Sequence, residues 1–286
     1  MEIRGRMHYI LKHNMLLNFF DQVYVINLKH RIDRRVEMED ELNAHGIPFV
    51  LFEATYDDNG IKGLFETMKR LFADALAKGY RNIIVLEDDA HFLVKNPVAF
   101  LAEVLPQIPK DYHLFYLGLN LIAKPIRVSE NVLKVIDCYS THAVAYSREG
   151  MQITAERLEH VPLMPYDIFI RQEVLGRGAS YCTFPMMATQ RENYSDIEKS
   201  IPKWGQLMAT TFAMHTKNLQ IMAQEIAYCI HGHEIEGRTP YVDEYKFETQ
   251  NHELIGKTCD CGRFVYSEGK CPTCSGEKWR VIWTEK

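Results

Sequence analysis

The feature that most constrains this fold is an alternation of apolar, strand-like runs with amphipathic helical segments in the first third of the chain. Three runs rich in β-branched and aromatic side chains predict buried strands: residues 22–28 (QVYVINL), 47–52 and 82–86 (NIIVL). Helical periodicity over residues 31–45 and 62–78 separates them, and a glycine follows each helix, Gly46 and Gly79. Strands that alternate with helices favour a parallel sheet covered on both faces, so we expect a single-sheet α/β fold.

Shorter elements are expected downstream. The patterns predict helices at residues 96–105, 148–159, 166–175 and 203–228, and strands at residues 113–117, 133–135 and 143–146. After His231 polar residues increase and the apolar periodicity fades, which places a domain boundary between residues 237 and 257. We therefore expect one large domain over residues 1–236, then a linker and a small module over residues 237–286, folded at about 257–283.

Three adjacent carboxylates, Glu87, Asp88 and Asp89, directly follow the strand at residues 82–86. In open α/β sheets ligands bind beyond the carboxyl ends of the strands. Alternate residues of an extended segment point the same way, so Glu87 and Asp89 can face one divalent cation while Asp88 faces elsewhere. Mn²⁺ and Mg²⁺ prefer such oxygen ligands and accept phosphate as a partner. Acidic residues are also common in solvated loops at strand ends, and that alternative stays open.

The ordered set of motifs resembles glycosyltransferase family 25, which includes bacterial lipopolysaccharide β-galactosyltransferases and collagen galactosyltransferases. VYVINL is followed by DRR and then by IIVLEDD; THAVAY at residues 141–146 and a late set, Asp167, Pro185, Gln190 and residues 195–197 (SDI), follow in order. The resemblance covers residues 22–197. One step departs from it: residues 54–58 read ATYDD where the family has an acidic residue before glycine, which leaves the donor sugar open.

The resemblance implies a GT-A-like fold, in which a single sheet binds a nucleotide sugar, most often a UDP-sugar with Mn²⁺. It places Asn27 and Leu28 near the donor, and it makes Arg31, Arg34 and Arg35 candidates to meet the diphosphate. Asp88 is a further candidate to contact the donor, as is His142, which lies in a predicted strand near the same face. Glu87 and Asp89 would hold the metal, with His231 or His233 as a further ligand, and Asp167 or Asp196 would be the general base or a partner of a sugar hydroxyl. The alternatives are a solvated first helical turn for the arginines, a core role for His142 and a surface turn for His231 and His233.

Four of the seven cysteines cluster near the end as C-x-C-G and C-P-x-C-x-G: Cys259, Cys261, Cys271 and Cys274. Two close pairs separated by a hairpin's length predict a tetrahedral zinc site, with ribbon strands at residues 264–266 and 278–283. The other three, Cys138, Cys182 and Cys229, are expected to be buried free thiols, and the odd total favours a reducing compartment. The ribbon is either a structural cap or, through its interleaved basic and aromatic residues, a docking site for the acceptor.

The charge and the N-terminus limit the remaining function classes. The net charge of −5 comes without a long run of one sign, so it gives no global attraction to nucleic acid or an anionic membrane. No stretch is long and apolar enough to span a bilayer, and residues 1–20 read as an irregular lead-in rather than a signal peptide. A cytoplasmic protein is expected, in the cytoplasm of the host cell if the source is a virus.

We therefore expect a metal-dependent, inverting glycosyltransferase that moves a sugar from a UDP-sugar to an acceptor hydroxyl. The acceptor would be a glycan or a hydroxylated base in phage-type modified DNA. The alternative is a non-catalytic module that binds nucleic acid or protein through the zinc ribbon on a degenerate scaffold. A nucleotide-sugar hydrolase would use the same site with water as the acceptor.

Overall fold

The computed structural model describes residues 19–192, 194–197, 199–201, 203–217 and 219, with strand segments between residues 241 and 285. Its strands up to residue 190 are β1 (Gln22–Asn27), β2 (Val50–Glu53), β3 (Asn82–Glu87), β4 (Ala90–Phe92), β5 (Leu114–Leu121), β6 (Ile126–Arg127), β7 (Val132–Lys134), β8 (Cys138–Ser147), β9 (Ser180–Thr183) and β10 (Ala188–Gln190). Its α-helices are α2 (Ile32–Ala44), α3 (Gly60–Ala77), α4 (Pro97–Val104), α5 (Arg148–His160), α6 (Tyr166–Phe169) and α7 (Trp204–Thr216).

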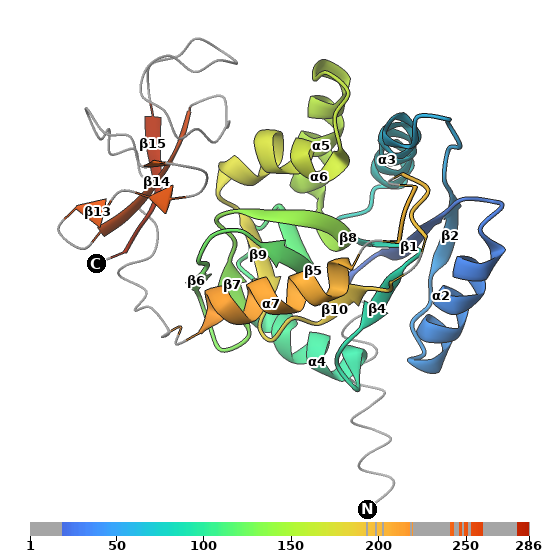
Figure 1. Cartoon of the computed structure of the whole chain (residues 1–286), viewed down its shortest axis with the longest axis horizontal. Coiled ribbons are helices and arrows are strands. Elements are labelled where there is room, and N and C mark those ends of the chain that lie inside the picture. The colour runs from blue at the N-terminus through green and yellow to red at the C-terminus, as the bar shows by residue number, and fades with distance from the viewer. Residues whose placement is uncertain are drawn as a thin grey trace, which may run out of the picture.

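One large sheet organises the described domain, in the order β2-β1-β3-β8-β5-β9-β7-β6 (Figure 1). β1 runs parallel to both β2 and β3, as the alternating pattern predicts. β8 is antiparallel to β3 and β5, however, so the sheet is mixed and the expectation of a parallel sheet is wrong for this half. The connection from β5 to β8 passes through the short strands β6 and β7 and contains no helix of the kind that usually links parallel strands.

Both faces of the sheet are covered, which confirms the expected α/β class. Leu71 of α3 and Met151 of α5 are fully buried in one apolar cluster, while Leu42 of α2 and Leu101 of α4 are buried in another. Val36 of α2 is 48% exposed despite its apolar side chain. Arg34 takes the inward position on that helix, so α2 presents a charged group to the carboxyl end of the sheet.

The downstream elements follow the expected order with different lengths. The helix expected at residues 166–175 is α6, followed by a π-helical turn (Ile170–Val174) and a 3-10 turn (Leu175–Arg177). The helix expected at residues 203–228 is described as α7, and residues 220–240 lie outside the described part. The expected strand at residues 143–146 is the middle of the longer β8, whose first residues matter for the site below.

The C-terminal region contributes an antiparallel pair, β14 (Glu253–Cys259) and β15 (Trp279–Glu285), in which Cys259 lies opposite Trp279. Several residues singled out above lie outside the described residues: Cys229, His231, His233, Cys261, Cys271, Cys274 and the strand at 264–266. The zinc ribbon and the domain boundary between residues 237 and 257 stay predictions. Cys138 and Cys182 are buried free thiols, as expected.

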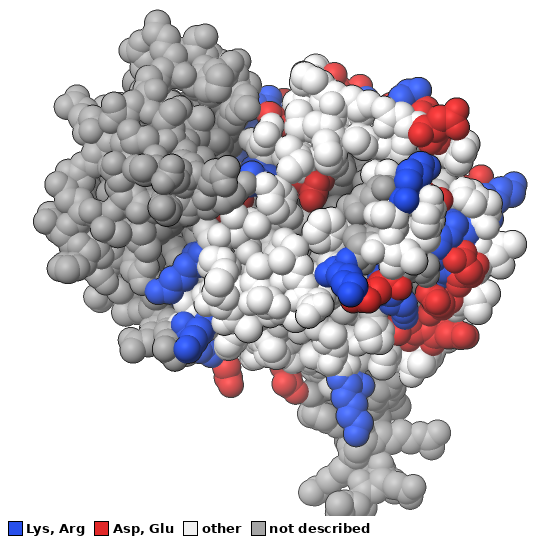
Figure 2. All heavy atoms as spheres, in the orientation of Figure 1, with Lys and Arg blue, Asp and Glu red and all other residues white. Residues whose placement is uncertain are grey.

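The surface shown in Figure 2 has no extended patch of one charge. Acidic and basic side chains are intermixed over α2, and the surface over the middle of α7 is uncharged (Figure 2). None of the described helices combines the length and the apolar character needed to cross a membrane.

Candidate active site

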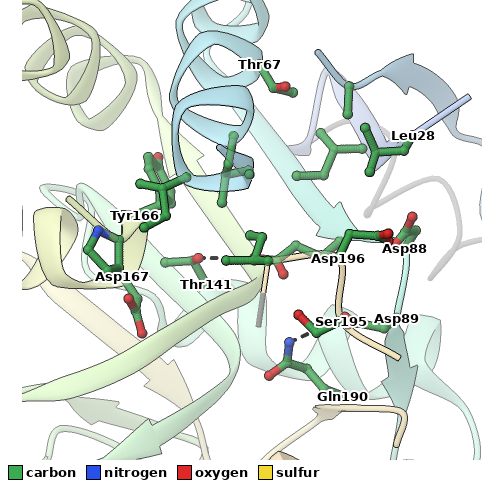
Figure 3. A pocket seen from close by; sticks show the side chains of 18 of the residues that line it. Leu28, Thr67, Asp88, Asp89, Thr141, Tyr166, Asp167, Gln190, Ser195 and Asp196 are labelled. Carbon is green, nitrogen blue, oxygen red and sulfur yellow. Dashed lines mark hydrogen bonds between the residues drawn. The ribbon is translucent and has the colours of Figure 1, made fainter. Parts of the chain in front are cut away.

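A cavity of about 450 Å³ opens where β1, β2 and β3 end. Its walls come from the turns after these strands, the N-terminus of α3, the first residues of β8, the start of α6 and the segment after β10. Leu28 and Asp88 lie on one side and Tyr166 and Asp167 on the other, with Thr141 between them (Figure 3). Glu87 accepts a hydrogen bond from Thr141, so the acidic triplet extends from the Leu28 side toward the opposite wall.

Of the three carboxylates in the triplet, Asp88 has its negative charge best balanced by hydrogen-bond donors. It is 8% exposed and accepts hydrogen bonds from the Asn27 amide at 2.8 Å and from the Arg34 guanidinium at 2.6 Å. Asn27 also donates to the backbone carbonyl of Arg31 at 3.1 Å, which ties the turn after β1 to the turn after β3. Asp88 therefore fixes the two strand ends against each other.

Glu87 and Asp89 face the cavity with weaker compensation. Glu87 accepts one hydrogen bond from the Thr141 hydroxyl at 3.1 Å, and Asp89 accepts a long one from the Gln190 amide at 3.4 Å and pairs with Arg34 at 3.1 Å. Desolvation raises the pKa of Glu87 to about 8, and the neighbouring charge of Asp89 adds to the rise. Desolvation also raises the pKa of Asp89. Raised pKa values mark carboxylates that a bound cation would stabilise.

The donor set fits a hard divalent cation in part. Among the described residues no group of three or more His, Cys, Asp and Glu side chains is arranged to hold a metal ion. Glu87 and Asp89 supply two recessed, incompletely compensated carboxylates, and Asp89 would exchange part of its pairing with Arg34 for a cation. The remaining ligands would come from the substrate diphosphate, from water or, as the sequence predicts, from His231 or His233, which lie outside the described residues.

A strap over the cavity, residues 194–196, is attached to α2 by two arginines. Arg31 donates to Asp196 at 2.6 Å and to the carbonyl of Tyr194 at 3.1 Å, and Arg34 donates to the same carbonyl at 2.9 Å. Asp196 thus lines the cavity as one half of an ion pair with Arg31.

The opposite wall is formed by α6 and the first residues of β8. Asp167 accepts from the backbone N–H of Ile168 at 2.8 Å and more weakly from that of Ser140 at 3.4 Å. Ser140 has φ of 75°, a left-handed conformation that is uncommon for a residue with a side chain. Asp167 lines the cavity, and among the described residues it makes no ion pair to arginine of the kind that holds Asp196.

The structure brings most of the expected site residues together. Seven of them line the cavity: Leu28, Arg34, Glu87, Asp88, Asp89, Asp167 and Asp196. Asn27 and Arg31 lie directly behind this lining and hold Asp88 and Asp196 in place.

Two residues that were expected to contact the nucleotide sugar, Arg35 and His142, do not line the cavity. The side chain of Arg35 is 53% exposed and pairs with Glu39 one helical turn away, because it follows the inward-facing Arg34 around α2. His142 is fully buried beside Gly118 and outside the cavity lining. Burial lowers its pKa to about 4, which makes it a neutral core side chain at pH 7.

The lining residues that were not identified from the sequence include Asn120, Tyr139 and Ser140. Asn120 interrupts the apolar run LFYLGLNL of β5, and an amide in a buried strand was a usable signal. Tyr139 and Ser140 precede the THAVAY motif and carry no local signal of their own.

Comparison with known proteins supports a glycosyltransferase. Residues 20–78 match the model of glycosyltransferase family 25 (LPS biosynthesis protein). This segment holds β1, α2 and β2 with the DRR motif, and it ends before the acidic triplet. The match covers less than half of the chain. No curated protein matched the chain in a sequence comparison.

Several solved structures share the fold at low sequence identity. A glycosyltransferase involved in the glycosylation of the major capsid of PBCV-1 is 13% identical, with a TM-score of 0.40, over 62% of this chain and 96% of its own. A197 from STIV is 11% identical, with a TM-score of 0.37, over 63% and 91%. UDP-glucose pyrophosphorylase complexed with UDP-glucose is 11% identical, with a TM-score of 0.37, over 73% and 86%. Similarity this low says nothing about what the present chain binds.

Proposed function

We propose that this protein is a metal-dependent, inverting glycosyltransferase that moves a sugar from a UDP-sugar to an acceptor hydroxyl. The observation that carries the proposal is the cavity at the carboxyl end of the sheet, with recessed carboxylates at its centre and a separate carboxylate, Asp167, on the facing wall. The match of residues 20–78 to a glycosyltransferase family supports the same class of reaction.

The end of the cavity over β1 and β2 suits the nucleotide. Apolar side chains such as Leu28, Ile61 and Leu64 line it together with Tyr56, and α3 begins there at Gly60. Planar bases bind well against such apolar and aromatic surfaces, and a helix N-terminus favours nearby negative charge.

The diphosphate would lie next to the acidic triplet, where its charge must be balanced. Arg34 neutralises part of the triplet because it contacts both Asp88 and Asp89. A divalent cation held by Glu87 and Asp89 would neutralise the charge that develops on the leaving UDP.

Of the two candidate general bases, we propose Asp167 rather than Asp196. The Asp196 carboxylate is already engaged by the Arg31 guanidinium at 2.6 Å, whereas Asp167 accepts hydrogen bonds from the backbone N–H groups of Ile168 and Ser140. Asp167 would take the proton from the acceptor hydroxyl as that oxygen forms its bond to the anomeric carbon. The bond between the anomeric carbon and the phosphate oxygen breaks at the same time, and UDP leaves with the electron pair.

The experiment is release of UDP from UDP-glucose and UDP-galactose in Mn²⁺, with and without a panel of glycan and hydroxymethylated-DNA acceptors. We expect turnover that needs Mn²⁺, a loss of at least about 100-fold in Asp89→Ala and Asp167→Asn, and normal folding of both variants. Asp40→Ala, which removes an exposed carboxylate on α2, is the matched control and should keep full activity. Full turnover in Asp89→Ala would overturn the metal assignment.

A further inference from the structure

The cavity runs across the ends of neighbouring strands, in the order in which they lie in the sheet. The nucleotide end lies over β2 and β1, the acidic triplet ends β3, and the far wall comes from β8 and β5. With about 4.8 Å between neighbouring strands, β5 lies about 14 Å from β1. A UDP-sugar that lies along this line has its base at one end and its sugar ring over β8 and β5.

Asn120 of β5 is a largely buried polar side chain at that far end. It is 7% exposed, lines the cavity, and lies opposite Tyr139 of β8 in the register of the two strands. Its carbonyl oxygen accepts a hydrogen bond from the Thr211 hydroxyl of α7 at 2.6 Å. Within the described residues its amide nitrogen has no hydrogen-bond partner and is not sealed from the cavity, so its N–H groups are available to a ligand.

The backbone of β5 explains why an amide can point into the cavity. The pairing with β8 is irregular on both sides of Gly118, and such bulges redirect the side chains that follow. Leu119 and Leu121 remain fully buried in the apolar core, whereas Asn120 between them reaches the cavity.

Neighbouring side chains make the far wall rigid. Arg171 forms two hydrogen bonds to the buried Asp137, at 2.6 and 2.8 Å, and donates to the Tyr139 hydroxyl at 2.9 Å. Its guanidinium also lies over the Tyr139 ring, 4.9 Å from the centroid. Because Asp137 balances the charge of Arg171, this wall offers an aromatic surface and neutral hydrogen-bonding groups beside Asp167.

We propose that Asn120 donates a hydrogen bond to a hydroxyl of the donor sugar and sets the preference among UDP-sugars, and that Thr211 is the positioning residue that orients its amide. The inference rests on the proposed function and adds the sugar subsite to it. An oriented amide in a largely buried position discriminates strongly, because a sugar without the matching hydroxyl leaves the buried N–H unpaired.

The test is isothermal titration calorimetry of the full-length protein in Mn²⁺ with UDP, UDP-glucose and UDP-galactose. Asn120→Ala should lower the affinity for the tighter-binding UDP-sugar about tenfold and change the affinity for UDP by less than about twofold. Asn120→Asp keeps the size of the side chain and the acceptor for Thr211 but removes the N–H donors. It should therefore lower the affinity for the UDP-sugar by the same factor. Thr211→Val should also lower the affinity for the UDP-sugar, and Thr211→Ser, which keeps the hydroxyl, should retain the wild-type affinity. Thr210→Val, at the preceding position, is the control. Within the described residues the Thr210 hydroxyl donates to the carbonyl of Gln206 on its own helix, so this variant should bind all three ligands as the wild type does.

The outcomes separate the two proposals. Equal weakening of UDP and the UDP-sugars in Asn120→Ala, or no weakening at all, overturns the sugar subsite while the proposed function stands. Unaltered binding in Thr211→Val removes the positioning role of Thr211. Failure of the wild-type protein to bind any of the three ligands overturns the proposed function and the subsite with it.

Discussion

At the scale of single residues, the three adjacent carboxylates after β3 have three different environments. Asp88 accepts charge-assisted and amide hydrogen bonds and serves the structure, whereas Glu87 has one neutral donor, the Thr141 hydroxyl. Asp89 lies between these cases because it shares Arg34 with Asp88. Their surroundings, rather than their residue type, decide which of them can take a cation.

Replacement of Glu87 by glutamine should stabilise the metal-free protein in a pH-dependent way. The pKa of Glu87 is raised to about 8 in the folded protein from 4.5, mainly by desolvation, so the wild type loses stability as the pH rises through that interval. Glutamine does not titrate. The melting temperature of Glu87→Gln in EDTA should exceed that of the wild type by about 2–4 °C at pH 8.5, a shift that corresponds to about 1 kcal/mol, and by almost nothing at pH 4.5.

The control for this prediction is Asp40→Asn, which removes one exposed carboxylate of α2. Its difference from the wild type should not grow with pH in the same manner. A Glu87→Gln difference that is constant over this pH range would show that Glu87 is not held in its protonated form by the fold.

The neighbouring arginines of the DRR motif should differ strongly in their effect on stability. The side chain of Arg34 is 9% exposed and pairs with Asp88 at 2.6 Å and Asp89 at 3.1 Å. Its removal leaves buried carboxylates unpaired, so Arg34→Ala should lower the free energy of unfolding by about 3–5 kcal/mol. Arg35 is 53% exposed and pairs with Glu39, so Arg35→Ala should cost about 0.5 kcal/mol or less. Urea denaturation measures both, and equal losses would contradict the burial of Arg34.

At the scale of elements, β5 shows how backbone packing shapes the site. A Cβ atom at Gly118 would lie 2.1 Å from the carbonyl oxygen of Ala188 and 2.5 Å from Nε2 of His142. The strand can therefore approach β10 and the buried His142 only with glycine here, and the irregular pairing that exposes Asn120 depends on this position.

Gly118→Ala should therefore destabilise the protein more than Gly79→Ala. The first substitution forces backbone atoms apart and should lower the free energy of unfolding by about 3 kcal/mol. Gly79 has φ of 78° but nothing within 4 Å of an added Cβ, so alanine there should cost only the left-handed strain of about 1 kcal/mol. Denaturant unfolding compares the two, and a reversed order would contradict the packing around Gly118.

The sequence predicts the elements of the sheet well and their pairing less well. Apolar runs mark β1, β3 and the helices between them, because buried strands and amphipathic helices have distinct periodicities. The antiparallel insertion of β8 between β3 and β5 depends on long-range pairing that no local pattern encodes.

The same division holds for the site. The triplet stands out as three carboxylates at a strand end, and the family resemblance pointed to Asp167. Asn120 becomes a candidate only once the irregular strand and Thr211 are seen together. For His142, within the THAVAY motif, the sequence left a donor contact and a core role open, and the structure shows a buried core side chain.

At the scale of the whole molecule, the cavity joins segments that are far apart in the chain. Leu28 follows the first strand, whereas Asp196 and Gln190 come from the end of the domain, and Arg31 links the two through Asp196. Ligand binding should therefore stabilise the fold globally, because the same contacts hold the strap, α2 and the end of β3 together.

Thermal melting of the full-length protein with UDP, UDP-glucose and UDP-galactose, each with and without Mn²⁺, tests the central claim most directly. The account predicts a rise in melting temperature that requires Mn²⁺ and a UDP ligand together, that is larger for one UDP-sugar than for UDP, and that disappears in Asp89→Ala. A well-folded wild-type protein whose melting temperature responds to none of these combinations would contradict the assignment of the cavity as a metal-dependent nucleotide-sugar site.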